Sequence, residues 1–246
     1  MNNSIALEVK NVCKTYLTKT GNVDALKNIT LSIKQGEIFG LLGPNGAGKT
    51  STFYIIAGLT KADKGDIIFD EKNISNMSMH HRSNYGLKYL PQEPSIFANL
   101  TVYENLYGLA ELNFKKKGDI NKFIDSSVDE FDLSKILKLK GRQLSGGQRR
   151  KVEIARTLAS KPKLILLDEP FAGIDPIAIE DIKNVLKNLS AKKIGVLITD
   201  HNVRETLEIC NNGAIINNGK IIAKGNTQNL IENDKVKKVY LGSMYS

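Results

Sequence analysis

The sequence predicts an α/β fold, in which a largely parallel sheet is flanked by helices. Two observations predict it. An apolar segment at 38–42 leads through a glycine-rich turn into a segment of helical character at 50–57. After residue 147, helical segments and apolar strand-like segments alternate as far as residue 209. The length of 246 residues allows one large domain or two closely associated ones.

The other elements follow from the spacing of apolar residues along the chain. Alternation of apolar and polar residues predicts strands at 5–9 and 29–33, and further short strands at 65–70 and 86–90. The later alternation predicts a helix at 147–159, a strand at 163–167, a helix at 177–189, a strand at 194–199 and a helix at 203–209.

A different pattern runs from residue 101 to about residue 139. Apolar residues recur there at helical spacing with polar residues between them, which predicts a helical segment inserted into the α/β unit. The residues that carry this spacing are Val102, Leu106, Leu109, Ala110, Phe123, Ile124, Val128 and Phe131.

Composition is that of a folded globular protein, with 41% hydrophobic and 25% charged residues. No apolar run approaches the ~20 residues that a membrane-spanning helix needs, and no secretory signal precedes the first strand, so we expect a cytoplasmic protein. Cys13 and Cys210 fit neither a CxxC nor a metal-ligand pattern. The net charge of +9 is compatible with binding of anionic lipid, nucleic acid or nucleotide. No aromatic residues interleave with a basic stripe, as they would in a nucleic-acid-binding surface.

The glycine-rich turn at 43–50 has the spacing Gly-x4-Gly-Lys-Thr between a strand and a helix. Glycines allow backbone N–H groups to close around phosphates, the Lys49 side chain can reach the β- and γ-phosphates, and the Thr50 hydroxyl can coordinate Mg²⁺. A plain helix-capping turn is the alternative. The turn predicts binding of ATP with Mg²⁺ through Gly43, Pro44, Asn45, Gly46, Ala47, Gly48, Lys49, Thr50 and Ser51.

Two carboxylates follow the apolar strand at 163–167. Ligands bind at the carboxyl ends of strands in open α/β sheets, which is where Asp168 and Glu169 stand. We expect Asp168 to hold Mg²⁺ through water and Glu169 to orient or deprotonate the attacking water. A solvated acidic pair would be the alternative for an isolated Asp-Glu.

The string Leu144-Ser145-Gly146-Gly147-Gln148 matches the signature of ATP-binding-cassette (ABC) ATPases. Its serine and glycines open a helix, whose free N–H groups and dipole favour an anion. The chain therefore resembles this family over essentially its whole length. The resemblance implies one nucleotide-binding domain over residues 1–246, with a RecA-like phosphate-loop core, an N-terminal antiparallel β subdomain, a helical subdomain at about 93–160 and a C-terminal tail from about 226.

Further roles come from the resemblance alone. Tyr16 is expected to stack on adenine, and Gln92 to contact Mg²⁺ and water. Asp175 is expected in the loop that crosses the dimer interface, and His201 to contact the γ-phosphate and support Glu169. Taken singly, Tyr16 would be a core aromatic and His201 a structural or solvated histidine.

The family mechanism implies a head-to-tail pair of cassettes. Each ATP lies between the phosphate loop of one copy and the signature residues Ser145, Gly146, Gly147 and Gln148 of the other copy. Closure around ATP and reopening after hydrolysis would drive membrane-embedded permease partners.

Longer strings at 89–97, 168–178 and 197–207, with the tail at 239–242, resemble the ATPase subunits of lipopolysaccharide exporters. This resemblance implies attachment to the inner membrane through permeases, with an apolar groove for their coupling helix. Ala98 stands where a basic residue is expected in these ATPases, and residues 243–246 differ from their usual C-terminal tail. A different ABC transporter, such as a branched-chain amino-acid importer, and a soluble ABC ATPase are the alternatives. The predicted groove residues are Ile96, Phe97 and Leu100.

Overall fold

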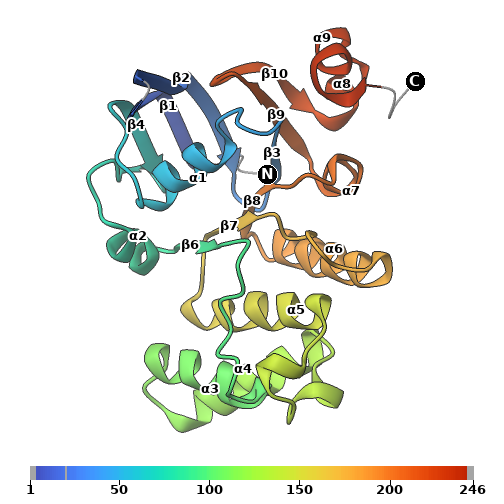
Figure 1. The fold of residues 1–246 in the computed structure, drawn as a ribbon. Helices are drawn as coiled ribbons and strands as arrows, with labels where there is room; N and C mark the ends of the chain where they lie inside the picture. The colour runs from blue at the N-terminus through green and yellow to red at the C-terminus, as the bar shows by residue number, and fades with distance from the viewer. Residues whose placement is uncertain (1–3, 20, 243–246) are drawn as a thin grey trace.

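Two β-sheets and a group of helices make up the computed structural model, which describes residues 4–19 and 21–242 (Figure 1). The predicted α/β fold is confirmed. Within the described ranges, no helix combines the length and apolarity needed to cross a membrane.

The N-terminal sheet is antiparallel, in the order β2-β1-β4-β5. Leu7, Val9, Ile29 and Leu31 are buried, as their alternation predicts. The first two strands are longer than predicted, because their outer halves form a half-exposed hairpin in which the apolar alternation fades. The strands are β1 (Ile5–Thr18), β2 (Gly21–Lys34), β4 (Lys64–Phe69) and β5 (Lys72–Asn73).

The second sheet has six strands in the order β10-β9-β3-β8-β7-β6, all parallel to their neighbours except β10. Every residue of β3, β7 and β8 is buried, which explains their continuous apolar runs. Strands β9 and β10 were not predicted from the sequence. The strands are β3 (Ile38–Leu42), β6 (Leu87–Leu90), β7 (Leu164–Asp168), β8 (Gly195–Thr199), β9 (Asn212–Asn217) and β10 (Lys220–Asn226).

The two faces of this sheet pack against different elements of the fold. Leu164 and Leu166 of β7 belong to a core shared with the antiparallel sheet and the helix that follows the glycine-rich turn. Ile165 and Leu167 point into a second core, shared with the helix between β7 and β8. Because side chains alternate along a strand, one strand serves both cores. These helices are α1 (Lys49–Ala57) and α6 (Pro176–Ala191), and α7 (Val203–Ile209) follows β8.

Helices α3, α4 and α5 form a helical layer at one end of the molecule (Figure 1). Leu106, Ile124 and Phe131 are buried within it, so the helical segment predicted at 101–139 is confirmed. The helices of this layer are α3 (Val102–Asn113), α4 (Lys117–Glu130) and α5 (Gly146–Thr157). The remaining helical elements are α2 (Met79–Tyr85), α8 (Thr227–Glu232), α9 (Asp234–Val236), a π-helical turn (Lys237–Leu241), and 3₁₀ turns at Ser134–Ile136, Gly141–Gln143 and Leu158–Ser160.

A buried guanidinium fixes the carboxyl end of α1. Arg82 is only 2% exposed, and its Nη1 donates hydrogen bonds to the carbonyl oxygens of Ile55 and Ile56 at 2.6 and 2.7 Å. Its other nitrogens donate to the carbonyls of Ser75 and Met77. Carbonyls in the last turn of a helix lack the usual partner within their own helix, and the Ile55 carbonyl also accepts a hydrogen bond from the Gly58 N–H at 3.2 Å, so Arg82 adds a charged donor to this helix end.

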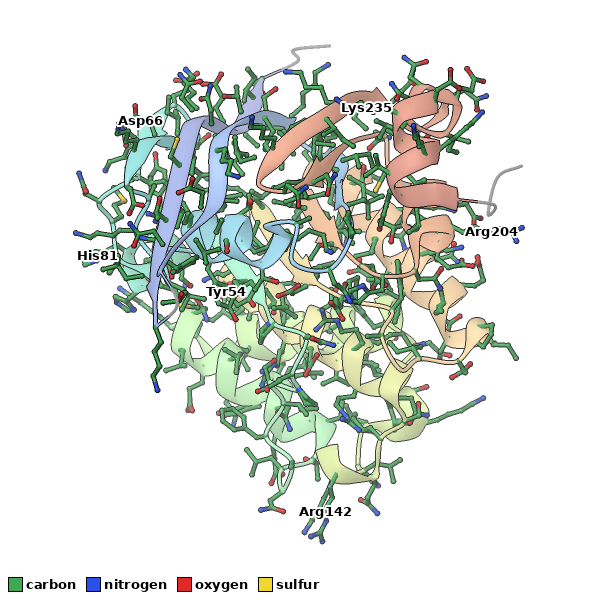
Figure 2. The ribbon with its side chains drawn as sticks, turned by 45° about the horizontal axis from the view of Figure 1, so that its top comes forward. Tyr54, Asp66, His81, Arg142, Arg204 and Lys235 are labelled. Atoms are coloured by element: carbon green, nitrogen blue, oxygen red, sulfur yellow. The ribbon has the colours of Figure 1, made fainter. Side chains whose placement is uncertain are left out.

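We expect Arg82→Met to lower the free energy of unfolding by about 2–4 kcal/mol, because buried carbonyls lose a charged donor. Urea unfolding followed by circular dichroism measures this loss. Arg142→Met is the matched control, since Arg142 is exposed at the far end of the helical layer (Figure 2). An equal effect of the two substitutions would contradict the capping role of Arg82.

Candidate functional site

The turn between β3 and α1 can be built only with glycine at its two ends. Gly43 and Gly48 have φ angles of 155° and 114°. A Cβ atom on Gly43 would lie 2.0 Å from the carbonyl oxygen of Ile216, and one on Gly48 would lie 2.8 Å from the carbonyl oxygen of Ala25. The backbone therefore passes closely between neighbouring strands, and its N–H groups can face outward to an anion.

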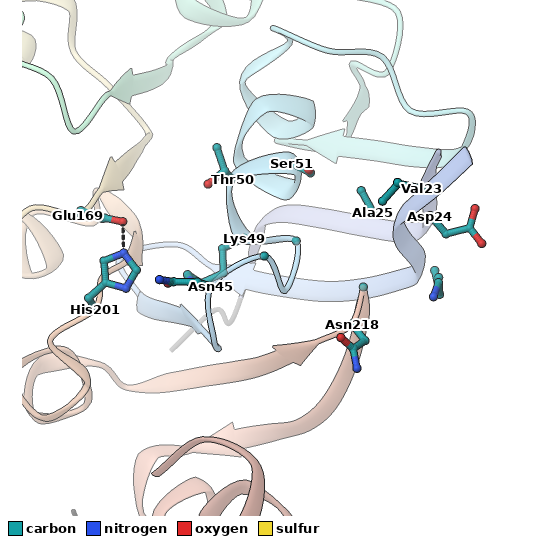
Figure 3. A pocket seen from close by; sticks show the side chains of 14 residues that line it. Val23, Asp24, Ala25, Asn45, Lys49, Thr50, Ser51, Glu169, His201 and Asn218 are labelled. Atoms are coloured by element: carbon teal, nitrogen blue, oxygen red, sulfur yellow. Dashed lines mark ion pairs between the residues drawn. The ribbon is translucent and has the colours of Figure 1, made fainter. Parts of the chain in front are cut away.

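A cavity of about 600 Å³ opens over this turn (Figure 3). Its volume falls within the range of small-molecule sites. Gly43, Pro44 and Ala47 of the predicted set shape the turn without lining the cavity. The walls are formed by Asn45, Gly46, Gly48, Lys49, Thr50, Ser51, Val23, Asp24, Ala25, Lys27, Glu169, His201, Asn218 and Gly219.

Lys49 supplies a buried cation at the wall of this cavity. Its side chain is 7% exposed, and its Nζ donates hydrogen bonds to the carbonyl oxygens of Gly43 and Pro44 at 2.7 and 3.0 Å. Burial lowers the pKa of Lys49 below its ordinary value, while Glu169 and Asp168 act in the opposite direction. The ammonium group is thus held by the turn itself, on the side where a phosphate would be received.

The two carboxylates predicted at the end of β7 have different surroundings. Asp168 is 8% exposed, and burial raises the pKa of its carboxyl group above the ordinary value. The Tyr89 hydroxyl donates a hydrogen bond to Asp168 Oδ2 at 3.1 Å. Glu169 has a φ angle of 47°, and its N–H donates to the Thr199 carbonyl at 2.7 Å. The unusual backbone turns the Glu169 side chain into the cavity (Figure 3).

His201 and Glu169 form an ion pair across the cavity wall (Figure 3), with 2.6 Å between Nε2 and Oε1. The neighbouring Asp200 is buried and accepts hydrogen bonds from the N–H groups of Phe171 and Asn202 at 2.9 and 2.7 Å. Asp200 therefore ties the loop that carries His201 to the loop that carries Glu169.

Gln92 faces a second cavity, of about 490 Å³, which shares Glu169 with the first. Gly146 and Gly173 also line it. The structure thus brings the predicted residues Gln92, Glu169 and His201 around one region, although they come from separate parts of the chain.

The signature residues do not line the cavity of the phosphate loop. Ser145 caps α5, where its Oγ accepts a hydrogen bond from the Gln148 N–H while Gln148 Oε1 accepts one from the Ser145 N–H. Gly147 packs against α6, since a Cβ atom there would lie 2.4 Å from Ala178 Cβ. Asp175 caps the start of α6.

Tyr16 also lies outside the cavity lining, although Val23, its partner across the β1–β2 hairpin, lies within it. Sequence reasoning missed Asn218 and Gly219, which form the turn between β9 and β10. Both have φ angles in the left-handed region, and the Gly219 N–H donates to the Ala47 carbonyl at 2.9 Å. An Asn-Gly pair between two apolar runs is typical of a hairpin turn, and this signal could have predicted it.

Comparisons with known proteins agree on one family. Residues 26–172 match the family model described as ABC transporter. The chain is 47% identical to the lipopolysaccharide export system ATP-binding protein LptB of Haemophilus influenzae, over 97% of this chain and 98% of that protein. A nucleotide-free ATP-binding cassette from an ABC transporter is 31% identical with a TM-score of 0.85, covering 97% of this chain and 100% of that structure. A dimeric bacterial ABC transporter cassette is 26% identical with a TM-score of 0.79, covering 90% of this chain and 98% of that structure.

We expect Lys49→Ala to weaken binding of a fluorescent ATP analogue by about 10- to 100-fold, because a charge-assisted hydrogen bond to phosphate is lost. Titration of the purified chain measures this affinity. Lys122→Ala, an exposed lysine of α4, is the charge-matched control. Unchanged binding by the Lys49 variant would contradict the assignment of the turn.

Proposed function

Because the chain belongs to the ABC transporter family and is an ATP-hydrolysing transporter subunit, we propose that it powers the export of lipopolysaccharide from the inner membrane. The observation that carries this proposal is the 47% identity to a lipopolysaccharide export ATPase over nearly the full length of both chains. By comparison, the nucleotide-free ATP-binding cassette from an ABC transporter matches a similar share of this chain but is only 31% identical to it.

The cavity over the phosphate loop is the proposed ATP site. Lys49 and the backbone N–H groups of the turn bind the phosphates, and Thr50 and Ser51 begin the helix whose positive end faces them. Tyr16 stacks on adenine at the rim, next to Val23. The exposed hairpin that carries both residues leaves room for a base beside the cavity.

The oxygen donors at the site fit Mg²⁺, which prefers carboxylate, hydroxyl and amide oxygens. The Thr50 hydroxyl lines the cavity, and Gln92 faces the adjoining one. Oδ2 of Asp168 is held by Tyr89, whereas Oδ1 accepts no hydrogen bond from a described residue. Thr50, Asp168 and Gln92 would hold the ion, which neutralises negative charge on the β- and γ-phosphates when bound.

Glu169 is the proposed base for the attacking water. Its carboxylate lines the cavity near the phosphate loop, and its backbone is fixed by the hydrogen bond to Thr199. His201 Nε2 lies 2.6 Å from Glu169 Oε1 and so holds the carboxylate in one orientation. The His201 side chain is 54% exposed and therefore free to contact the γ-phosphate as well. Together they orient water for in-line attack.

A second copy of the chain completes each site in this proposal. Ser145 and Gly146 are exposed at the amino end of α5, where the helix dipole favours an anion. Because the Ser145 hydroxyl accepts its hydrogen bond from Gln148, its own O–H remains available to donate to a phosphate. A head-to-tail dimer would bring Gly147, Gln148 and the loop at Asp175 to the partner's ATP. The similar bacterial ABC transporter cassette is described as dimeric, which supports the pairing of two copies.

The loop before α3 is the proposed docking surface for permease subunits, through which the chain attaches to the cytoplasmic face of the inner membrane. Phe97 and Leu100 are 53% and 40% exposed, while Ile96 is half-buried. The buried Asn105 side chain holds the loop by accepting a hydrogen bond from the Phe97 N–H and donating to the Phe97 and Leu100 carbonyls. Ala98 is exposed beside them and adds no charge.

Recovery of the membrane partners tests the proposed function. A tagged chain expressed in its own cells is purified from detergent-solubilised inner membranes, and the recovered complex is assayed for ATP hydrolysis and for release of lipopolysaccharide from vesicles. Lipopolysaccharide permeases and ATP-dependent lipid release are expected. Recovery of an amino-acid permease instead would replace this function with the importer alternative.

We expect Glu169→Gln to reduce ATP turnover by about 10²- to 10³-fold while ATP affinity stays within a few-fold of wild type, because the amide cannot accept the proton of water. Phosphate release and equilibrium nucleotide binding measure the two quantities. Turnover close to that of wild type would remove Glu169 from the proposed mechanism.

We expect Phe97→Ala to abolish co-purification of the permeases and to leave ATP binding by the isolated chain unchanged, because an apolar anchor of the docking surface is lost. Leu112→Ala, which alters an 82% exposed leucine at the end of α3, is the matched control. Intact recovery of permeases with the Phe97 variant would rule out this surface.

A further inference from the structure

Tyr89 lies behind the proposed Mg²⁺ ligand Asp168 and has been given no role of its own so far. Its hydroxyl donates the hydrogen bond to Asp168 Oδ2 at 3.1 Å, and no other side chain in the described part of the chain hydrogen-bonds to this carboxylate.

Strand pairing brings these two residues together. In the parallel ladder of β6 and β7, Tyr89 pairs with Leu166, two positions before Asp168. Side chains at alternate positions share one face of a strand, so Leu166 and Asp168 lie on the face toward which Tyr89 also projects. The Tyr89 hydroxyl thus reaches diagonally to the carboxyl end of the neighbouring strand.

The Tyr89 ring is also held from the side of α1. It packs edge-to-face against the ring of Tyr54, with 6.3 Å between ring centroids and an angle of 82° between the rings. Tyr54 lies on α1, above the helical layer (Figure 2), one helical turn after Thr50 and so on the same helix face. Tyr89 therefore contacts both α1, which carries Thr50, and Asp168 at the carboxyl end of β7.

We propose that Tyr89 is a positioning residue for the Mg²⁺ of the ATP site: by holding Asp168 Oδ2, it would leave Oδ1 to serve the ion. This role rests on the proposed ATP hydrolysis. Partners that orient a metal-binding carboxylate act in this way in other metal sites, where their loss weakens the metal about 10- to 100-fold. A tyrosine that only filled the core would contribute through its ring, and its hydroxyl would be dispensable.

Tyr89→Phe separates these roles, because it removes the hydroxyl and keeps the ring. Tyr85→Phe is the matched control, since Tyr85 is also half-buried and its hydroxyl has no hydrogen-bond partner among the described residues. The full-length chain and both variants are titrated with a fluorescent, non-hydrolysable ATP analogue, first in EDTA and then at increasing free Mg²⁺. Mn²⁺ binding followed by electron paramagnetic resonance reports the metal directly.

For Tyr89→Phe we expect affinity in EDTA within twofold of wild type, and a half-saturating Mg²⁺ concentration raised about 10-fold, with a matching loss of Mn²⁺ affinity. Tyr85→Phe should match wild type. Unchanged metal dependence in the Tyr89 variant, or an equal loss of affinity with and without metal, would overturn the positioning role. If the wild-type chain binds no analogue at any Mg²⁺ concentration, the proposed ATP site itself is wrong. This outcome differs from a failure of the positioning role, in which wild type still binds the analogue.

Discussion

The hydrogen bond from the Glu169 N–H to the Thr199 carbonyl is the contact on which the site depends. It extends the ladder of β7 and β8 one residue beyond Asp168, the last residue of β7. Because β8 lies between β7 and β3, the acidic pair, the loop of His201 and the phosphate loop all emerge at the same edge of the sheet. Parallel pairing in this order is what converts three distant segments into one cavity.

The same sheet is consistent with the proposal that one copy of the chain holds only part of the site. Strands β3, β7 and β8 are fully buried, so they can present side chains only at their ends. The signature turn belongs instead to α5 in the helical layer, where Gly147 is packed against α6 and cannot approach the phosphate loop of its own copy without breaking that contact. In the proposed mechanism, the signature residues of a second copy supply the other half of the site.

Local patterns predicted the central strands, the phosphate loop and the acidic pair, since each is encoded within a few consecutive residues. The continuous apolar run of β7 and the glycine spacing at 43–50 are such patterns. The β9–β10 hairpin escaped prediction although its Asn-Gly turn was visible. The contacts of Tyr89 and Arg82 could not be predicted, because each depends on the pairing of segments far apart in the sequence.

The segment from β6 to α3 is held at both ends by the helical layer and the site. At its start, Arg150 of α5 donates hydrogen bonds to the carbonyls of Pro91 and Asp168 at 3.0 and 3.3 Å. At its end, Asn105 holds the backbone around Phe97. At the same time, β6 contacts Asp168 through the Tyr89 hydroxyl, so the start of this segment is tied to the carboxyl end of β7. The proposed docking surface and the proposed hydrolytic site are thus linked by the hydrogen bonds of Asn105, Arg150 and Tyr89.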